Sequence, residues 1–408
     1  MLNAIKALYN KLLVVLLSFT AILSSGAVAD GWPSWNHETA FVPFFYSTES
    51  MGFTLGAAGL IKGVGQDQAG LLGVGLRSEK GSYITYLSGV NYQFGDNLLV
   101  GADGYNAKYV DFDYFLGEQG NNSSEQSSAT RTDGRESNYR LSLRYILPIG
   151  HAESLGAQAA LHNSRDISGK TPFDSGVSTI ELQPFYSSRE LEVNYNEAEE
   201  TWGMALKLDW DNRNDVRNPT EGSRTSLDVT YSPEFKQDSE WVKLEFENNL
   251  YWDLGNLKDV FDKQVLAFSF YTADTPNWSD CGNDDCHRPP EYEQVALGGL
   301  YRLRSYGSNR FHGRSAIHYS AEYRVMPEWQ PLGDWPVFNF YDVPWWQWVA
   351  FVDVGRVADE YNLKTLHTDM KWSAGGAIRF QVEGIVVRTE LAWGKEDSAF
   401  WVMVNQPF

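Results

Sequence analysis

Apolar and polar residues alternate one by one along most of this chain, a pattern that predicts β-strands whose two faces meet different surroundings. The run 370–382 is the clearest case. One face carries Met370, Trp372, Ala374, Gly376, Ile378, Phe380 and Val382, and the other carries Lys371, Ser373, Gly375, Ala377, Arg379 and Gln381. We count 16 runs of this kind from Met51 onward, the sixth at 154–166. The predicted fold class is therefore all-β.

The polar faces of these runs carry charges in mid-strand, which distinguishes two kinds of all-β fold. In the run 384–394, Arg388 and Glu390 lie on the face opposite Val387 and Leu391. The dry core of a β-sandwich would penalise both charges, whereas a water-filled lumen would not. Most runs also reach the ~9 to 11 residues of a tilted transmembrane strand. Because an open edge in lipid would leave backbone groups unpaired, we predict a closed antiparallel transmembrane β-barrel of 16 strands.

The first 29 residues have the features of a secretory signal peptide. Lys6 and Lys11 precede an apolar run from Leu12 to Leu23, and Ala27-Val28-Ala29 forms a small-residue cleavage site. A membrane anchor is the alternative, although the run is shorter than the ~20 apolar residues of a spanning helix. We therefore divide the chain into a signal peptide (1–29), a short periplasmic N-terminal segment (30–50) and an outer-membrane barrel (51–408).

The net charge argues against nucleic acid as a partner. It is −20 for the whole chain, and removing Lys6 and Lys11 with the signal peptide takes it to −22. The mean hydropathy of −0.38 resembles that of a soluble protein, but a membrane barrel gives the same value because half of each strand faces water. The aromatic share of 14%, with 15 Trp and 22 Tyr, fits aromatic girdles in contact with outer-membrane lipid.

A 40-residue connection, 275–314, separates two strand-patterned runs and is far longer than an ordinary loop. Its apolar residues Leu303, Tyr306 and Phe311 and its glycines predict an ordered loop folded against the rest of the protein. The two runs that follow place Glu322 and Asp353 on their polar faces. A basic segment of the loop can meet these carboxylates there.

Two motifs connect this loop to those strands: Leu303-Arg304-Ser305-Tyr306 in the loop and Phe351-Val352-Asp353-Val354-Gly355 in a strand. At these residues the chain resembles the bacterial surface antigen barrel superfamily, which includes the BamA insertase and the two-partner secretion transporters. In that superfamily the sixth extracellular loop folds into the barrel, and its arginine pairs with the acidic residue of the strand motif. The resemblance implies a loop anchor in the lumen formed by Arg304, Tyr306, Gly307, Glu322, Phe351, Asp353 and Gly355.

The resemblance extends from about residue 209 to the last residue. Asp211-x-Arg213, followed by a turn that contains Pro219 and Gly222, matches the periplasmic turn signature of the family. Ser305 stands where the family usually has glycine, and Gly307 follows two positions later. The terminal Phe408 resembles the recognition signal by which outer-membrane barrels are assembled, although an ordinary aromatic terminus is the alternative.

Family members usually carry periplasmic POTRA repeats ahead of the barrel. The ~21 residues between the cleavage site and Met51 are too few for one such domain, which predicts a short member without POTRA domains. Within these residues, 41–46 is an inward plug, an extra strand or a segment on the lipid surface.

Two further connections and a cysteine pair carry predictions. Strand parity places 115–136, which is polar and predicted to be flexible, and the aromatic 327–345 on the periplasmic side. The second of these either anchors at the lipid headgroups or contacts a partner. Cys281 and Cys286, the only cysteines, are predicted to form a small disulfide in the oxidising periplasm, with metal binding as the alternative.

No catalytic constellation is evident, and we predict that the chain is not an enzyme. The seven histidines lack the spacing of a barrel phospholipase, and no phosphate loop, zinc helix or dinucleotide fingerprint implies a cofactor. The resemblance implies assembly or transport of a polypeptide or lipid at the outer membrane, with the loop either gating or bracing the pore. A separate periplasmic protein is a possible further partner. The alternative is a passive porin or a structural barrel.

Overall fold

The computed structural model describes residues 39–48, 51–194, 198–234, 240–258, 260–279, 287–331, 343–382, 385–396, 398–404 and 406–408. The predicted signal peptide, the cysteine pair Cys281 and Cys286, and most of the aromatic connection lie outside these residues. The chain divides into two compact units. Unit 1 comprises Met1–Asp113, Arg131–Leu143 and Gln183–Thr201, and unit 2 comprises Tyr114–Thr130, Arg144–Leu182 and Trp202–Phe408.

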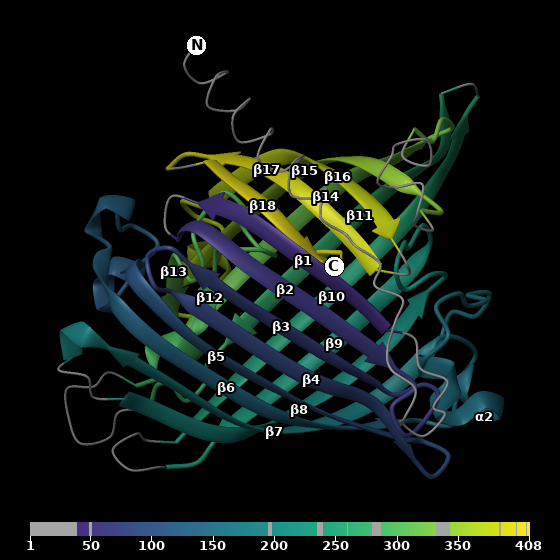
Figure 1. The fold of residues 1–408 in the computed structure, drawn as a ribbon, viewed down its shortest axis with the longest axis horizontal. Coiled ribbons are helices and arrows are strands. Elements are labelled where there is room, and N and C mark those ends of the chain that lie inside the picture. The colour runs from purple at the N-terminus through teal and green to yellow at the C-terminus, as the bar shows by residue number, and fades with distance from the viewer. Residues whose placement is uncertain are drawn as a thin grey trace. The chain divides into compact units, whose positions relative to one another are not determined.

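Most of the described residues belong to one antiparallel sheet, whose strands are labelled in Figure 1. In the described part of the chain this sheet has 16 strands, paired in chain order. They are β1 (Thr39–Thr48), β2 (Gly52–Lys62), β3 (Gly70–Ser78), β4 (Tyr83–Phe94), β5 (Leu98–Tyr114), β6 (Thr130–Ile146), β7 (Val177–Leu191), β8 (Ala198–Arg213), β9 (Gly222–Ser232), β10 (Trp241–Leu257), β11 (Phe261–Asp274), β14 (Ser315–Pro327), β15 (Trp346–Ala358), β16 (Lys371–Val382), β17 (Ile385–Gly394) and β18 (Ser398–Val404). The short strands β12 (Val295–Leu297) and β13 (Phe311–Gly313) pair separately.

Helical elements are short and lie in the connections. The α-helices are α2 (Ala152–Leu155) and α3 (Leu363–Leu366), and the 3₁₀ helices are η2 (Gly117–Gly120), η3 (Gln126–Ser128), η4 (Gly156–Ala160), η5 (Glu192–Asn194) and η6 (Glu291–Glu293). Among the described residues, none of the helices has the length and hydropathy needed to cross a membrane.

The alternation of side chains sets the two faces of the strands in unit 2, where β14, β15, β16 and β17 lie side by side (Figure 1). On β14, His318, Ser320 and Glu322 are almost completely buried, whereas Tyr319 and Tyr323 are each 39% exposed. The polar face of the sheet is therefore the covered one. The predicted alternation is confirmed here, and the sheet buries charges on the face that would line a lumen.

Two of the predicted segment assignments need to be settled against the structure. The run 154–166 contains no strand of the sheet: its first residues continue α2 into η4, because alanine, glutamine and leucine favour helical over extended backbone. In contrast, the segment 41–46 lies within β1, which pairs with β2 from Thr39↔Ile61 to Thr48↔Gly52. Of the three alternatives for this segment, the structure shows an extra strand.

The part of the predicted connection that belongs to unit 2, 115–130, contacts the 275–314 loop, so its predicted position on the opposite side from that loop is wrong. Gly117 donates a backbone hydrogen bond to Glu291 of that loop. Asn122 donates to the carbonyl of Asp369, which follows β15 at the same end. The predicted strand count left out β1 and included 154–166. Every connection between these two segments was therefore assigned to the wrong end of the strands. The connection is also a folded segment, with η2 and η3 in it.

Candidate functional site: a loop anchored by arginine

The 275–314 loop folds back on itself through a small β-ladder. β12 pairs with β13 in the register Leu297↔Phe311, and the chain between them makes a compact turn. Gly298 and Gly299 have φ angles of 110° and 106°, which side chains with a Cβ rarely adopt. Leu303 also adopts a left-handed conformation, with φ of 50°. These reversals carry the residue after Leu303, Arg304, to the polar face of the sheet.

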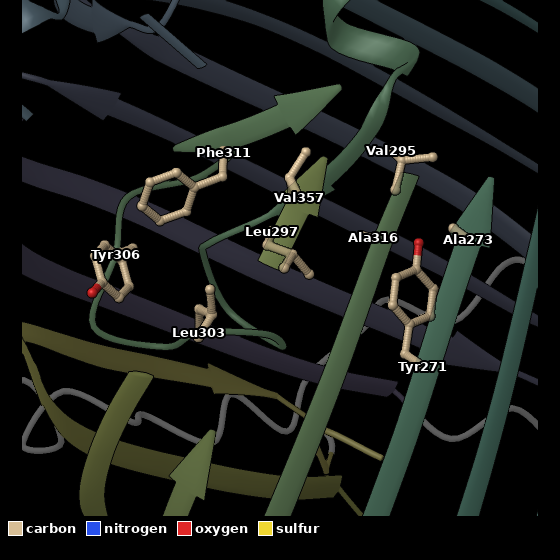
Figure 2. Close-up of a cluster of buried hydrophobic side chains, with 9 residues drawn as sticks. All are labelled: Tyr271, Ala273, Val295, Leu297, Leu303, Tyr306, Phe311, Ala316 and Val357. Atoms are coloured by element: carbon tan, nitrogen blue, oxygen red, sulfur yellow. The ribbon is translucent and has the colours of Figure 1, made fainter. Parts of the chain in front are cut away.

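An apolar cluster fixes this turn against the strands (Figure 2). Figure 2 shows Leu303, Tyr306 and Phe311 on the loop. The rings of Tyr306 and Phe311 meet edge to face, with centroids 5.1 Å apart, an arrangement favoured by aromatic quadrupoles. All members are at most 3% exposed: Tyr271, Ala273, Val295, Leu297, Leu303, Tyr306, Phe311, Ala316 and Val357. The three apolar residues expected to order the loop are thus buried.

Arg304 projects from this turn into a site formed by three strands. Its Nε and Nη2 donate to the two carboxylate oxygens of Asp353 at 3.0 and 2.9 Å, and its backbone N–H donates to the same carboxylate at 3.1 Å. Nη1 donates to Glu322 at 2.7 Å and to Glu390 at 3.4 Å. The guanidinium also lies 3.5 Å from the ring centroid of Phe351. The side chain has no exposed surface, so every polar contact it makes is within the protein.

Three further arginines complete a cluster of charges around Arg304. Arg379 bonds both Glu322 and Glu390, Arg324 bonds Glu322, and Arg388 bonds Glu390. Arg388 also donates to the carbonyl of Leu300 in the loop. We call these residues the arginine cluster: Arg304, Arg324, Arg379, Arg388, Glu322, Asp353 and Glu390.

Direct ion pairing within the cluster offsets the desolvation cost of burying its charges. Burial alone would lower the pKa of the Arg304 guanidinium, but the charges of Asp353 and Glu322 raise it above its ordinary value. Arg304 therefore remains a cation, and the charge-assisted bonds to its partners are strong because water is excluded. Such a contact holds a loop in one place.

The strand motif at 351–355 is explained by this contact. Phe351, Asp353 and Gly355 are two residues apart and share the covered face of β15. Phe351 supports the guanidinium, and Asp353 binds it. A Cβ on Gly355 would lie 2.9 Å from the side chain of Leu297 and 2.9 Å from the carbonyl oxygen of Ile317. The absence of a side chain at Gly355 therefore leaves space for Leu297 of the loop.

Replacing Gly375 with alanine is expected to displace the Phe351 ring that supports the Arg304 guanidinium and to destabilise the fold by about 1–3 kcal/mol. A Cβ there would overlap the carbonyl of Leu391 and lie 2.5 Å from the ring of Phe351. The neighbouring Gly376→Ala is the matched control, since its Cβ would meet only the carbonyl of Val349 at 3.5 Å. Urea midpoints in detergent micelles measure both, and equal midpoints would contradict the packing described.

The other predicted loop residues have different surroundings. Tyr306 is buried in the apolar cluster rather than in the arginine cluster. Gly307 is exposed and has room for a Cβ, so its conformation does not require glycine. Ser305 is buried and lies against Gly394, the last residue of β17. Among these motif residues the left-handed conformation falls at Leu303 and not at Gly307.

The predicted turn motif forms a separate site between β8 and β9. Arg213 donates through Nε and Nη2 to the two carboxylate oxygens of Asp211, at 2.8 and 2.9 Å. Arg165, from the connection between β6 and β7, reaches the same carboxylate at 2.9 Å. Gly222 has φ of 99° and begins β9, and Pro219 is buried in the turn. The site ties a long connection to the turn and lies outside the arginine cluster.

The C-terminal residues lie on the covered, polar face of the sheet. Phe408 packs in a buried cluster with Tyr251 and Ala267, and its ring centroid is 5.2 Å from the guanidinium of Arg324. Gln406 accepts a hydrogen bond of 2.7 Å from Arg379. The tail therefore borders the arginine cluster. That Phe408 acts as an assembly signal stays a prediction.

A second loop arginine, Arg310, was not identified from the sequence. It donates to the carbonyls of Gln119 and Ser124 at 3.2 and 2.7 Å and to the Ser124 hydroxyl at 2.8 Å. Its remaining bonds go to Glu396, between β17 and β18, at 2.9 and 3.2 Å. Arg310 thus joins three connections of unit 2.

Replacing Arg310 with alanine is expected to release the connection 115–130. A hydrogen bond to a charged group contributes about 1.5–3 kcal/mol, so the loss of several raises local opening by about tenfold or more. Cleavage by a glutamate-specific protease at Glu118 and Glu125 measures this opening. Arg314→Ala is the control, because Arg314 pairs only with Asp274 among the described residues. Unchanged cleavage after Arg310→Ala would contradict the role of this residue.

A long antiparallel sheet with an exposed apolar face, a covered charged face and a loop held on that covered face is typical of the transmembrane sheets of outer-membrane proteins. The model of the Omp85 superfamily domain matches residues 75–398. The chain therefore belongs to the Omp85 superfamily and is a bacterial outer-membrane protein, which confirms the resemblance inferred from its motifs.

Solved structures support the same fold. CdiB from Escherichia coli superimposes with a TM-score of 0.57 at 13% identity, over 92% of this chain and 63% of that one. CdiB from Acinetobacter baumannii gives 0.52 at 11% identity, over 90% of this chain and 59% of that one. The chain thus spans less than two thirds of either structure, and at this identity the likeness shows a shared fold. No curated protein matches the sequence.

Proposed function

We propose that this chain is a gated outer-membrane barrel that inserts or translocates a polypeptide or a lipid, and that the 275–314 loop lies in its lumen. In this proposal the sheet closes into a 16-stranded barrel, because an open edge would leave backbone groups without partners in lipid. The role is not enzymatic, and it needs no cofactor and no nucleic acid. Membership of a superfamily that includes insertases and two-partner secretion transporters supports it.

One observation carries the proposal: the buried Arg304 joins the loop to carboxylates of three different strands. A loop fixed in this way crosses the polar face that would conduct solutes. Such a loop restricts a pore, and charge-assisted bonds in a dry site keep it there without a covalent link. A passive porin narrows its lumen with a different loop and lacks the motifs that join Arg304 to Asp353 here.

Single-channel recording in planar bilayers tests the proposal with the full-length protein. A barrel closed by its loop is expected to give small, flickering currents. A large and steady open state would favour the passive porin and would overturn the gated barrel. The measurement needs no knowledge of the substrate, which is a polypeptide or a lipid supplied from the periplasm in this proposal.

A further inference from the structure

The arginine cluster contains one more positive than negative charge. Its members divide into four guanidiniums and three carboxylates: Arg304, Arg324, Arg379 and Arg388 against Glu322, Asp353 and Glu390. All of these side chains are at most 1% exposed, so bulk water does not screen them. A buried charge without a counter-charge is costly. The surplus cation therefore indicates a place for an anion.

Arg324 is the guanidinium of this cluster with the fewest hydrogen bonds to described residues. Its Nε donates to Glu322 at 2.8 Å. Nη2 lies 2.8 Å from the same carboxylate but is not aligned for a hydrogen bond, and Nη1 has no partner in the described part of the chain. Glu322 also accepts hydrogen bonds from Arg304 and Arg379. Arg324 therefore carries the surplus charge.

Two aromatic rings cover Arg324 in place of an anion. The ring centroids of Phe408 and Tyr251 lie 5.2 and 5.4 Å from its guanidinium carbon. The faces of aromatic rings attract a cation, but the rings have no net charge and do not balance it. Gln406, in the same C-terminal tail, accepts a hydrogen bond of 2.7 Å from Arg379. Residues 406–408 are thus a neutral substitute for an anion.

Phe408 contacts both Arg324 and a cavity of about 220 Å³ beside the 275–314 loop. The ring is part of the cavity lining, whereas Arg324 is not. The charged residues of that lining, Arg302 and Glu247, bond each other, so they hold no charge in reserve for a ligand. Movement of the ring into the cavity would expose the guanidinium of Arg324. The space left by a phenyl ring is large enough for a phosphate group.

The donors at this position match the chemistry of phosphate. A guanidinium can bind two phosphate oxygens at once, and Nη1 and Nη2 of Arg324 are the two nitrogens without hydrogen bonds to described residues. The hydroxyl of Tyr251 is a further donor, and it lies in the positive field of three guanidiniums, those of Arg213, Arg324 and Arg224. A phosphate group presents more acceptor oxygens than a carboxylate and can carry a second negative charge. Both properties suit this position.

We propose that Arg324 and Tyr251 form a phosphate-binding site, and that the Phe408 ring occupies it until a phosphate group displaces the ring. The group belongs to free phosphate or to the headgroup of a phospholipid, which present the same chemistry to Arg324. The tail is an internal competitor, because the ring and the phosphate use the same space. The inference does not depend on what the barrel transports.

Equilibrium dialysis with inorganic phosphate tests the site. The chain and its variants are refolded from urea into a maltoside detergent, which contains no phosphate. Phe408→Ala is expected to bind phosphate about tenfold more tightly than the unchanged chain, the scale of losing one desolvated cation–π contact. Gln406→Ala loosens the same tail while keeping Phe408, so it should raise the affinity by a smaller factor.

Variants of the arginines locate the bound phosphate. In the Phe408→Ala background, Arg324→Gln is expected to abolish the gain in affinity, whereas Arg302→Gln should leave it. Arg302 is the matched control, because it lines the cavity and lies 3.6 Å from the ring centroid of Tyr271 but is paired with Glu247. Tyr251→Phe removes one hydroxyl and should weaken binding about fivefold. Heat-resistant migration in gels shows that each variant is folded.

The outcomes decide both the site and the source of the phosphate. If neither tail variant binds phosphate more tightly than the unchanged chain, or if Arg302→Gln lowers binding as much as Arg324→Gln, the site is wrong. Acetate that competes as well as phosphate would overturn the choice of phosphate. Competition by dihexanoyl phosphatidylglycerol, a short-chain phospholipid, assigns the site to a lipid headgroup, and the lack of competition assigns it to free phosphate.

Discussion

Replacing Arg304 with alanine is expected to release the 275–314 loop and to lower the free energy of unfolding by about 3–5 kcal/mol. Asp353 would then lose both guanidinium bonds, and its remaining side-chain donors among the described residues would be the hydroxyls of Ser320 and Ser373, at 2.8 and 3.0 Å. A buried carboxylate without its counter-charge is the main source of this loss. Urea unfolding in detergent micelles measures the stability, and single-channel currents should become larger and steadier.

Three variants separate the contribution of the Arg304 charge from that of its hydrogen-bond geometry. Arg304→Lys keeps the charge but cannot bind Asp353 through two nitrogens, so an intermediate loss is expected. Adding Asp353→Asn to Arg304→Ala removes the unpaired charge and should recover part of the stability. Arg314→Ala should change stability by less than ~1 kcal/mol, because its ion pair is partly exposed. If Arg304→Ala matches this control in both stability and current, Arg304 does not anchor the loop.

The pair at the centre of the site could be predicted because local alternation placed the strand residues on one face and the resemblance to the family's loop and strand motifs implied the pairing of Arg304 with Asp353. Strand alternation placed Asp353, Phe351 and Gly355 on one face, and the loop motif supplied Arg304. None of these inferences needs the position of one strand relative to a distant one. The structure places each residue on the expected face and brings Arg304 and Asp353 together.

The rest of the site depends on register, which the sequence pattern does not define. Alternation gave the correct face for Glu390, but its contact with Arg304 requires the register of β17 against β16, where Ala377 pairs with Glu390. The partners of Arg310 lie 86 to 191 residues away in the chain. No local signal specifies such a contact. Sequence reasoning therefore identified two of the three carboxylate partners of Arg304, Asp353 and Glu322, and missed Glu390 as a partner and Arg310 as a second loop arginine.

The errors in the fold have a local cause. Pro43 interrupts the strand pattern of 39–48 because it lacks an N–H, yet β1 pairs with β2 along its whole length, with Pro43 opposite Ala57. The run 154–166 alternates as a strand does, but it relies on small alanines. Two of them, Ala157 and Ala159, are buried in η4. Alternation of small residues thus carries less information than alternation of large ones.

Replacing Glu322 with glutamine is expected to be as damaging as removing Arg304, at about 3–5 kcal/mol. Its two oxygens accept four hydrogen bonds from Arg304, Arg324 and Arg379, at 2.7 to 2.9 Å. The glutamine amide would direct an N–H₂ group at one of these cations. The arginine cluster would then hold four guanidiniums against two carboxylates, with no water to screen them.

Arg324→Gln provides the complementary test, since it should cost little by itself. Glu322 keeps two guanidiniums after this change, and the cluster then has three cations and three anions. Arg324 already has two nitrogens without hydrogen-bond partners in the described part of the chain. Combined with Glu322→Gln, the change should recover more than about 1 kcal/mol relative to the sum of the single losses. Strict additivity in urea unfolding would mean that the charges are not coupled, and the loop would then be held by the apolar cluster around Leu303 rather than by Arg304.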